Sequence, residues 1–229
     1  MLQALWHVAR DDRAWRRLPS GSPPHQTVWG RLMAWRRRAV LDRAPGVHRC
    51  RRHRSCRRLA AGRKRRPTAA IVDTQSVKTG PQRGPRGYGA AKKVKGRKRV
   101  LMIDTRGDPL GVRVVSADAQ DRDALPALGP DLEAHASLLL VWPDRGFAGE
   151  DAATFLHARG ITSEVVGTPG RRGFQVEPRR WKVEQTFGCL LRYRRLRVDD
   201  EAGLETSRHM TVLASVFMTG MRLERMLRW

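Results

Sequence analysis

Acidic residues are scarce in this sequence relative to basic ones. Its 229 residues include 46 Lys and Arg but only 22 Asp and Glu, which leaves a formal net charge of +24. A positive field of this size attracts polyanions, so nucleic acid is the first partner to consider. A protein that only packs nucleic acid would carry the same excess. The charge therefore indicates a partner without indicating a reaction.

Cysteine and long apolar runs are scarce as well. Three cysteines form no even framework, which argues against a disulfide-stabilised secreted scaffold. The longest late apolar stretch, residues 210–221, is too short to span a bilayer, and no apolar run near the start follows a basic segment. We therefore expect a cytoplasmic, nucleoid-associated protein without a membrane partner.

The first 43 residues have the pattern of two amphipathic helices. Residues 2–18 repeat apolar side chains at helical spacing, and residues 27–38 combine an apolar stripe with an arginine-rich face. Two such helices could dock on DNA, and a solvated basic face would give the same pattern. We expect residues 1–43 to be a helical N-terminal region that binds DNA.

Residues 44–66 have dense positive charge and almost no apolar periodicity, which predicts a disordered basic linker. Within this linker, His48, Cys50, His53 and Cys56 are candidate zinc ligands. Four ligands inside nine residues lack the separated pairs of a zinc fold, so the spacing disfavours zinc.

From residue 67 onward the patterns of strands and helices alternate. Strands are expected at 69–77, 100–104, 110–117, 137–142 and 161–167, and helices at 121–136, 149–159, 178–196 and 205–228. Strands that first follow one another and later alternate with helices indicate a mixed sheet between helical layers. The fold class is therefore α/β, with residues 67–229 as the main domain.

Three carboxylates stand in positions that suggest chemistry. Asp73 interrupts an apolar strand pattern, where an ionised carboxylate needs a cation or strong donors. Asp144 follows a buried strand at its carboxyl end, the edge at which α/β sheets commonly place ligands. Glu184 lies on a basic helix, where an ordinary ion pair with Arg180 four residues earlier is the simpler explanation.

Each carboxylate taken alone is more often structural than catalytic. Together they meet the demand of phosphodiester chemistry, in which two divalent ions need several hard oxygen ligands on rigid elements. Other acids have sufficient structural explanations, because Asp104 closes a strand while Asp121 and Asp123 open a helix.

Successive segments of the chain resemble the bacterial insertion-sequence transposases of the DDE class. The segments are IVDTQSVKTG at 71–80, GPRGYGAAKKVKGRKRVLMIDTRG at 84–107, QDRDA at 120–124, VWPDRGFAG at 141–149 and PRRWKVEQTFGCLLRYRRL at 178–196. The resemblance implies a ribonuclease H-like catalytic domain. It also implies an N-terminally truncated reading frame, because relatives usually have further residues ahead of this start.

The resemblance further implies a metal-dependent enzyme. Asp73, Asp144 and Glu184 would be its catalytic and metal-binding residues, holding two Mg²⁺ ions, with Mn²⁺ as an alternative. The enzyme would bind the terminal inverted repeats of its element, cut double-stranded DNA and join the 3′ ends to a target, as a homodimer that pairs two ends. A catalytically inactive DNA-binding remnant and a basic RNA-binding protein are the alternatives.

Basic side chains around these carboxylates are the expected DNA contacts. Lys92, Lys93, Lys95, Arg97 and Lys98 follow the first strand, with Tyr88 nearby, and could grip phosphates or stack on an unpaired base. A solvated hairpin arm is the alternative for that segment. By resemblance, the positions that bind DNA near the cut also include Arg180, Arg192, Arg194 and Arg195.

Overall fold

The computed structural model describes residues 1–38, 53–81, 84–165 and 178–227. Its helices are α1 (Leu2–Asp11), α2 (His25–Arg37), α5 (Asp121–Ala124), α6 (Gly129–Glu133), α7 (Glu150–His157), α8 (Pro178–Leu190) and α9 (Leu204–Leu227), with 3-10 turns η1 (Trp15–Arg17), η2 (Leu125–Leu128), η3 (Arg145–Phe147) and η4 (Arg194–Leu196). Its strands are β1 (Ala69–Lys78), β2 (Gly87–Gly89), β3 (Val94–Asp104), β4 (Pro109–Ser116), β5 (Leu140–Pro143) and β6 (Thr162–Ser163). A further helix at residues 53–59 is called the arm helix below.

One mixed sheet organises the described residues. Strand β1 lies at its centre, antiparallel to β3 on one side and parallel to β5 on the other. Beyond them, β4 pairs antiparallel with β3, and β6 pairs parallel with β5. The order β4-β3-β1-β5-β6 is that of the ribonuclease H-like fold, and the short β2 adds a hairpin at the start of β3. The predicted α/β class is confirmed.

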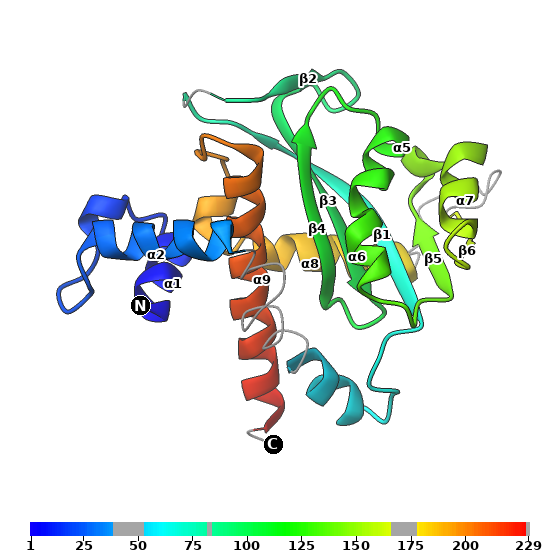
Figure 1. Cartoon of the computed structure of the whole chain (residues 1–229), viewed down its shortest axis with the longest axis horizontal. Helices are drawn as coiled ribbons and strands as arrows, with labels where there is room; N and C mark the ends of the chain where they lie inside the picture. The colour runs from blue at the N-terminus through cyan, green and yellow to red at the C-terminus, as the bar shows by residue number, and fades with distance from the viewer. Residues whose placement is uncertain (39–52, 82–83, 166–177, 228–229) are drawn as a thin grey trace.

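The alternation of side chains along β1 divides the core into two layers. Ile71 packs on one face with residues of α1, α2, α8 and α9, while Ala70 and Val72 pack on the other with residues of α5, η2, α6 and α7. Figure 1 shows α8 crossing behind the sheet and α5 and α6 in front of it. Successive strand residues point to opposite faces, so Asp73 shares the α8 face with Ile71.

The N-terminal helices form, as expected, and they share a hydrophobic cluster with the sheet. Leu5 and Val8 of α1 and Leu32 of α2 are fully buried in the layer that contains Ile71. None of the helices in the described part of the chain is long and apolar enough to cross a membrane.

The arm helix corrects the prediction that residues 44–66 are disordered. Although residues 39–52 lie outside the described part, residues 53–59 are helical, and Arg54, Arg57 and Arg58 are buried. Arg58 Nη1 lies 3.0 Å from Asp104 Oδ2, and Arg57 pairs with Asp108. Both acids flank the β3–β4 turn and are fully buried. The arginines therefore find a folded counter-charge, which composition alone could not indicate.

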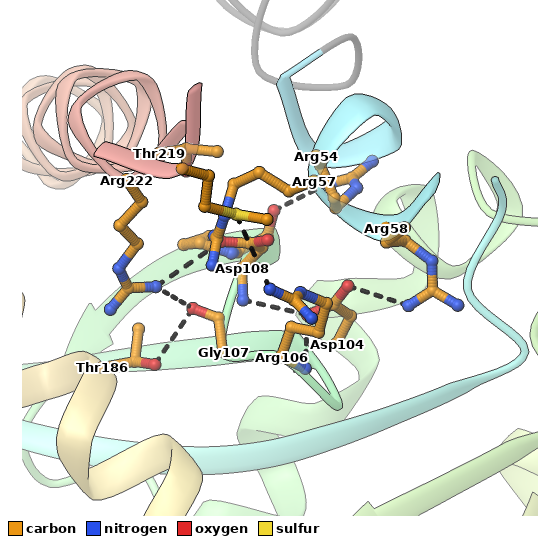
Figure 2. A network of polar contacts seen from close by, with 12 residues as sticks. Arg54, Arg57, Arg58, Asp104, Arg106, Gly107, Asp108, Thr186, Thr219 and Arg222 are labelled. Carbon is orange, nitrogen blue, oxygen red and sulfur yellow. Dashed lines mark hydrogen bonds and ion pairs between the residues drawn. The ribbon is translucent and has the colours of Figure 1, made fainter. Parts of the chain in front are cut away.

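The same turn also contacts two helices, as Figure 2 shows. The Gly107 carbonyl oxygen accepts hydrogen bonds from Thr186 Oγ1 of α8 at 3.1 Å and from Arg222 Nη1 of α9 at 2.7 Å. Asp104 Oδ1 accepts the backbone N–H groups of Arg106 and Asp108, so Asp104 caps the β3–β4 turn. The turn joins the arm helix, α8 and α9.

Several elements differ in length from the sequence prediction. Strand β5 begins only at Leu140, because the Leu138 N–H closes a turn onto His135 and Leu139 is 62% exposed. The predicted strand at 161–167 is limited to Thr162–Ser163 in the described residues. Helix α8 ends at Leu190, short of the expected residue 196, and the β2 strand was not anticipated.

Candidate active site

Asp73 and Asp144 are neighbours across two parallel strands. Val72 of β1 pairs with Pro143 of β5, and the Asp144 N–H donates to the Val72 carbonyl at 3.1 Å. The residue after each of these is an aspartate, Asp73 on β1 and Asp144 directly after β5, so the two carboxylates are neighbours at the carboxyl end of β5. Their adjacency follows from the register of the sheet.

Burial destabilises the ionised form of the Asp73 carboxyl group. The pKa of Asp73 is raised from the ordinary 3.8 to about 6; loss of solvation is the largest cause, and the neighbouring Asp144 charge acts in the same direction. The Thr74 N–H, which donates to Asp73 Oδ1 at 2.6 Å, lowers this pKa, as do the charges of Lys92 and Arg180. A pair of partly buried carboxylates of like charge favours the approach of a cation.

Glu184 is linked to the two aspartates through Arg180, which lies between them. Arg180 Nε lies 3.1 Å from Glu184 Oε1 on the same helix, and Arg180 Nη1 lies 3.9 Å from Asp144 Oδ1. The charges of Asp144, Glu184 and Asp73 all raise the pKa of Arg180, with Asp144 the largest influence. The ion pair proposed as the simpler explanation for Glu184 is thus present, and its guanidinium faces the aspartates as well.

The donor set fits a hard divalent cation in part. Asp144 Oδ1 is buried without a hydrogen-bond partner, since 3.9 Å to Arg180 is too long for one. A carboxylate oxygen of this kind is a suitable ligand for Mg²⁺. Among the described residues, however, no three His, Cys, Asp or Glu side chains converge closely enough to hold an ion. Two aspartates converge as predicted, while Glu184, with a side chain 56% exposed, remains on Arg180.

Asp73→Asn is expected to stabilise the protein at high pH when no divalent ion is present. Because the folded pKa of Asp73 is about 6 and its ordinary value is 3.8, stability from this group is complete below 3.8 and lost as the pH rises through 6. A neutral amide avoids that loss. The free energy of unfolding should therefore rise by about 1–3 kcal/mol at pH 8 and change little at pH 4.

Urea unfolding in EDTA at the two pH values measures this difference. Asp123→Asn is the matched control, because the Asp123 side chain is 64% exposed and the same chemical change there should have little effect at either pH. Equal stability of wild type and Asp73→Asn at pH 8 would contradict the raised pKa.

Three of the residues predicted to contact DNA form ion pairs within the protein. Arg97, which was expected to bind DNA, is 2% exposed and lies 3.0 Å from Asp199, so the structure buries it in an ion pair and does not present it at the surface. The ammonium of Lys98 lies 2.7 Å from Asp121, and its side chain is only 12% exposed. The guanidinium of Arg195 pairs with Glu201 at 3.0 Å and Asp12 at 3.3 Å. Each of these three cations therefore forms an ion pair within the protein, with at least one carboxylate that is distant in the sequence.

The other predicted contacts stay at the surface. Lys92, Lys93, Lys95, Arg192 and Arg194 are exposed, and the Arg180 side chain is half exposed. Lys92 is the nearest of the lysines to the carboxylates, because its ammonium donates to the Thr74 carbonyl at 3.3 Å, beside Asp73.

The sequence prediction missed two cations near these lysines. Lys78, at the end of β1, and Arg86, ahead of β2, line a pocket together with Tyr88, Lys93 and Lys95. The glycines around Tyr88 were the available signal for a close-packed hairpin that would gather these side chains.

A ribonuclease H-like sheet, with one aspartate on its central strand β1 and another directly after β5, defines the structural class of this domain. Within that class, a family model described as a transposase DDE domain matches residues 64–217, about two thirds of the chain. The chain belongs to this transposase family. A search of curated proteins found no match.

Two solved structures resemble the chain at low identity. One, described as the catalytic core domain of BIV integrase, is 16% identical with a TM-score of 0.41 and covers 65% of this chain and 81% of its own. The other, described as the Mos1 mariner paired end complex with Mn, is 12% identical with a TM-score of 0.34 and covers 99% of this chain and 77% of its own.

Proposed function

We propose that this protein is a transposase that binds the terminal inverted repeats of its own element, cleaves DNA at the element ends and joins the 3′-hydroxyls to a target. The adjacency of Asp73 and Asp144 within a transposase DDE domain is the observation that supports this most. The proposed division is a helical region at 1–43, a basic linker at 44–66 and a catalytic domain at 67–229, working as a homodimer on DNA in the nucleoid.

Asp73, Asp144 and Glu184 are the proposed ligands of divalent magnesium. The ions would polarise the scissile phosphate and activate water or a 3′-hydroxyl. Asp144 Oδ1, which is buried without a hydrogen bond, is the oxygen best prepared for such a ligand. Glu184 would join the aspartates by releasing Arg180, a change that a half-exposed side chain can make by rotating about its own bonds.

Once Glu184 has moved away, the Arg180 guanidinium would be free to bind the DNA backbone. Its pKa is raised by the carboxylates, so it stays charged, and a planar cation beside them suits a phosphate oxygen of the DNA. The exposed side chains of Lys92, Lys93, Lys95, Arg192 and Arg194 would hold the backbone on either side.

A nicking assay tests the proposal. Duplex DNA that contains the sequences flanking the gene should be cut with Mg²⁺ or Mn²⁺ and remain intact in EDTA, and a scrambled duplex should be cut less. Binding of the end DNA without any cutting would instead support the inactive remnant. Equal binding of end DNA, scrambled DNA and RNA without cutting would support the basic RNA-binding protein.

A further inference from the structure

A basic pocket lies between the end of β1 and the β2–β3 hairpin. It has a volume of about 410 Å³ and is lined by Lys78, Thr79, Arg86, Tyr88, Lys93 and Lys95. Cavities of about 300–1,000 Å³ are usual for bound small molecules. The pocket is therefore large enough for one nucleotide unit.

The lining of this pocket combines cations with an exposed aromatic ring. Four of the described lining residues are cationic and none is acidic. Tyr88 is 57% exposed although it is a large apolar side chain, and it pairs across the hairpin with Lys95. Phosphates bind to such cations, and a base of any sequence can stack on such a ring.

The backbone of the hairpin is fixed in the shape that presents these side chains. Lys93 has a φ of 51°, which is uncommon for a residue with a side chain and persists where the surroundings hold it. Gly96 lets β3 approach β1, because a Cβ at this position would lie 2.0 Å from the Val77 carbonyl oxygen. The lysines of the hairpin therefore lie where the start of β3 packs closely against the end of β1.

The pocket is connected to the proposed active site along β1. Lys78 follows Asp73 by five residues on the same strand, a distance of roughly 16 Å at the usual strand rise. A stacked DNA strand advances about 3.4 Å per nucleotide, so the span corresponds to about five nucleotides. Lys92, which adjoins the pocket residue Lys93, donates to the Thr74 carbonyl next to Asp73. Lys92 therefore places one cation between the pocket and the proposed active site.

We propose that this pocket holds one unpaired nucleotide of the DNA substrate, about five nucleotides from the phosphate at the carboxylates. Its base stacks on Tyr88, and its phosphates are bound by Lys93 and Lys95. The inference rests on the proposed function, because it takes DNA as the substrate, and it adds a site that distinguishes unpaired from paired DNA.

Fluorescence anisotropy with two probes tests the pocket in EDTA. One probe is a 20-base-pair fluorescein-labelled duplex with a tail of eight thymidines, and the other is the same duplex with blunt ends. Tyr88→Ala should weaken binding of the tailed probe roughly 5- to 150-fold, the effect of one lost stacking contact, and change blunt-duplex binding less than about twofold. Tyr88→Phe, which keeps the ring, should bind both probes as the wild type does.

Two lysine variants complete the experiment. Lys95→Ala should weaken binding of the tailed probe and lower its salt dependence by about one ion. Lys64→Ala removes one exposed charge outside the pocket and should affect the two probes equally. If Tyr88→Ala weakens both probes alike or neither, the pocket proposal is wrong. Because no divalent ion is present, this result is independent of the nicking assay, whose failure would contradict the proposed function alone.

Discussion

Asp144→Asn is expected to lower magnesium-dependent cleavage of element-end DNA on the order of 10³-fold while DNA binding stays unchanged. The amide is nearly the same size as the carboxylate, and the Asp144 N–H bond to the Val72 carbonyl does not involve the side chain. The fold should therefore persist. A neutral oxygen binds a hard cation more weakly than a carboxylate, and the buried Oδ1 without a hydrogen bond is the atom affected.

Product formation on a denaturing gel measures cleavage, and a mobility-shift assay with the same DNA measures binding. Asp151→Asn, at an exposed position in the first turn of α7, is the matched control and should cleave at the wild-type rate. Full cleavage by Asp144→Asn would remove this residue from the catalytic centre. Loss of binding together with cleavage would indicate a structural role instead.

The position of each aspartate relative to a buried strand could be predicted because it depends on local patterns. Asp73 stands in an apolar strand, and Asp144 directly follows another, so each position is readable from about ten residues of sequence. The parallel pairing of β1 with β5 then brings them together. The ion pair between Glu184 and Arg180 could also be predicted from the sequence, since the two residues are four apart on one helix.

Interactions between distant residues could not be predicted in this way. Arg97 and Lys98 have the sequence pattern of a solvated strand, yet the partner of Arg97, Asp199, lies 102 residues further along the chain. Arg58 in the apparent linker meets Asp104, which is 46 residues away. Local sequence periodicity does not show whether a basic residue forms an ion pair, because the carboxylate partner lies far along the chain. Such a residue is therefore predicted to be solvated.

Asp108→Ala is expected to destabilise the protein by about 3–5 kcal/mol, the usual loss when one partner of a buried ion pair is removed. Asp108 is fully buried and pairs with Arg57 of the arm helix, and Arg222 Nη1 of α9 lies 3.5 Å from the same oxygen (Figure 2). The variant would leave Arg57, with a side chain 8% exposed, without its counter-charge. Urea unfolding at neutral pH measures the change.

Arg63→Ala is the control, because Arg63 lies just beyond the arm helix and is exposed, so its loss should change the free energy of unfolding by less than about 0.5 kcal/mol. Replacing both partners, in Arg57→Met with Asp108→Leu, should recover much of the stability, since neither charge then stays buried alone. A loss below about 1 kcal/mol in Asp108→Ala would mean that the arm helix does not dock on the turn in solution. If it does dock, the variant should also impair cleavage, because the same turn accepts the Thr186 hydrogen bond two residues from Glu184.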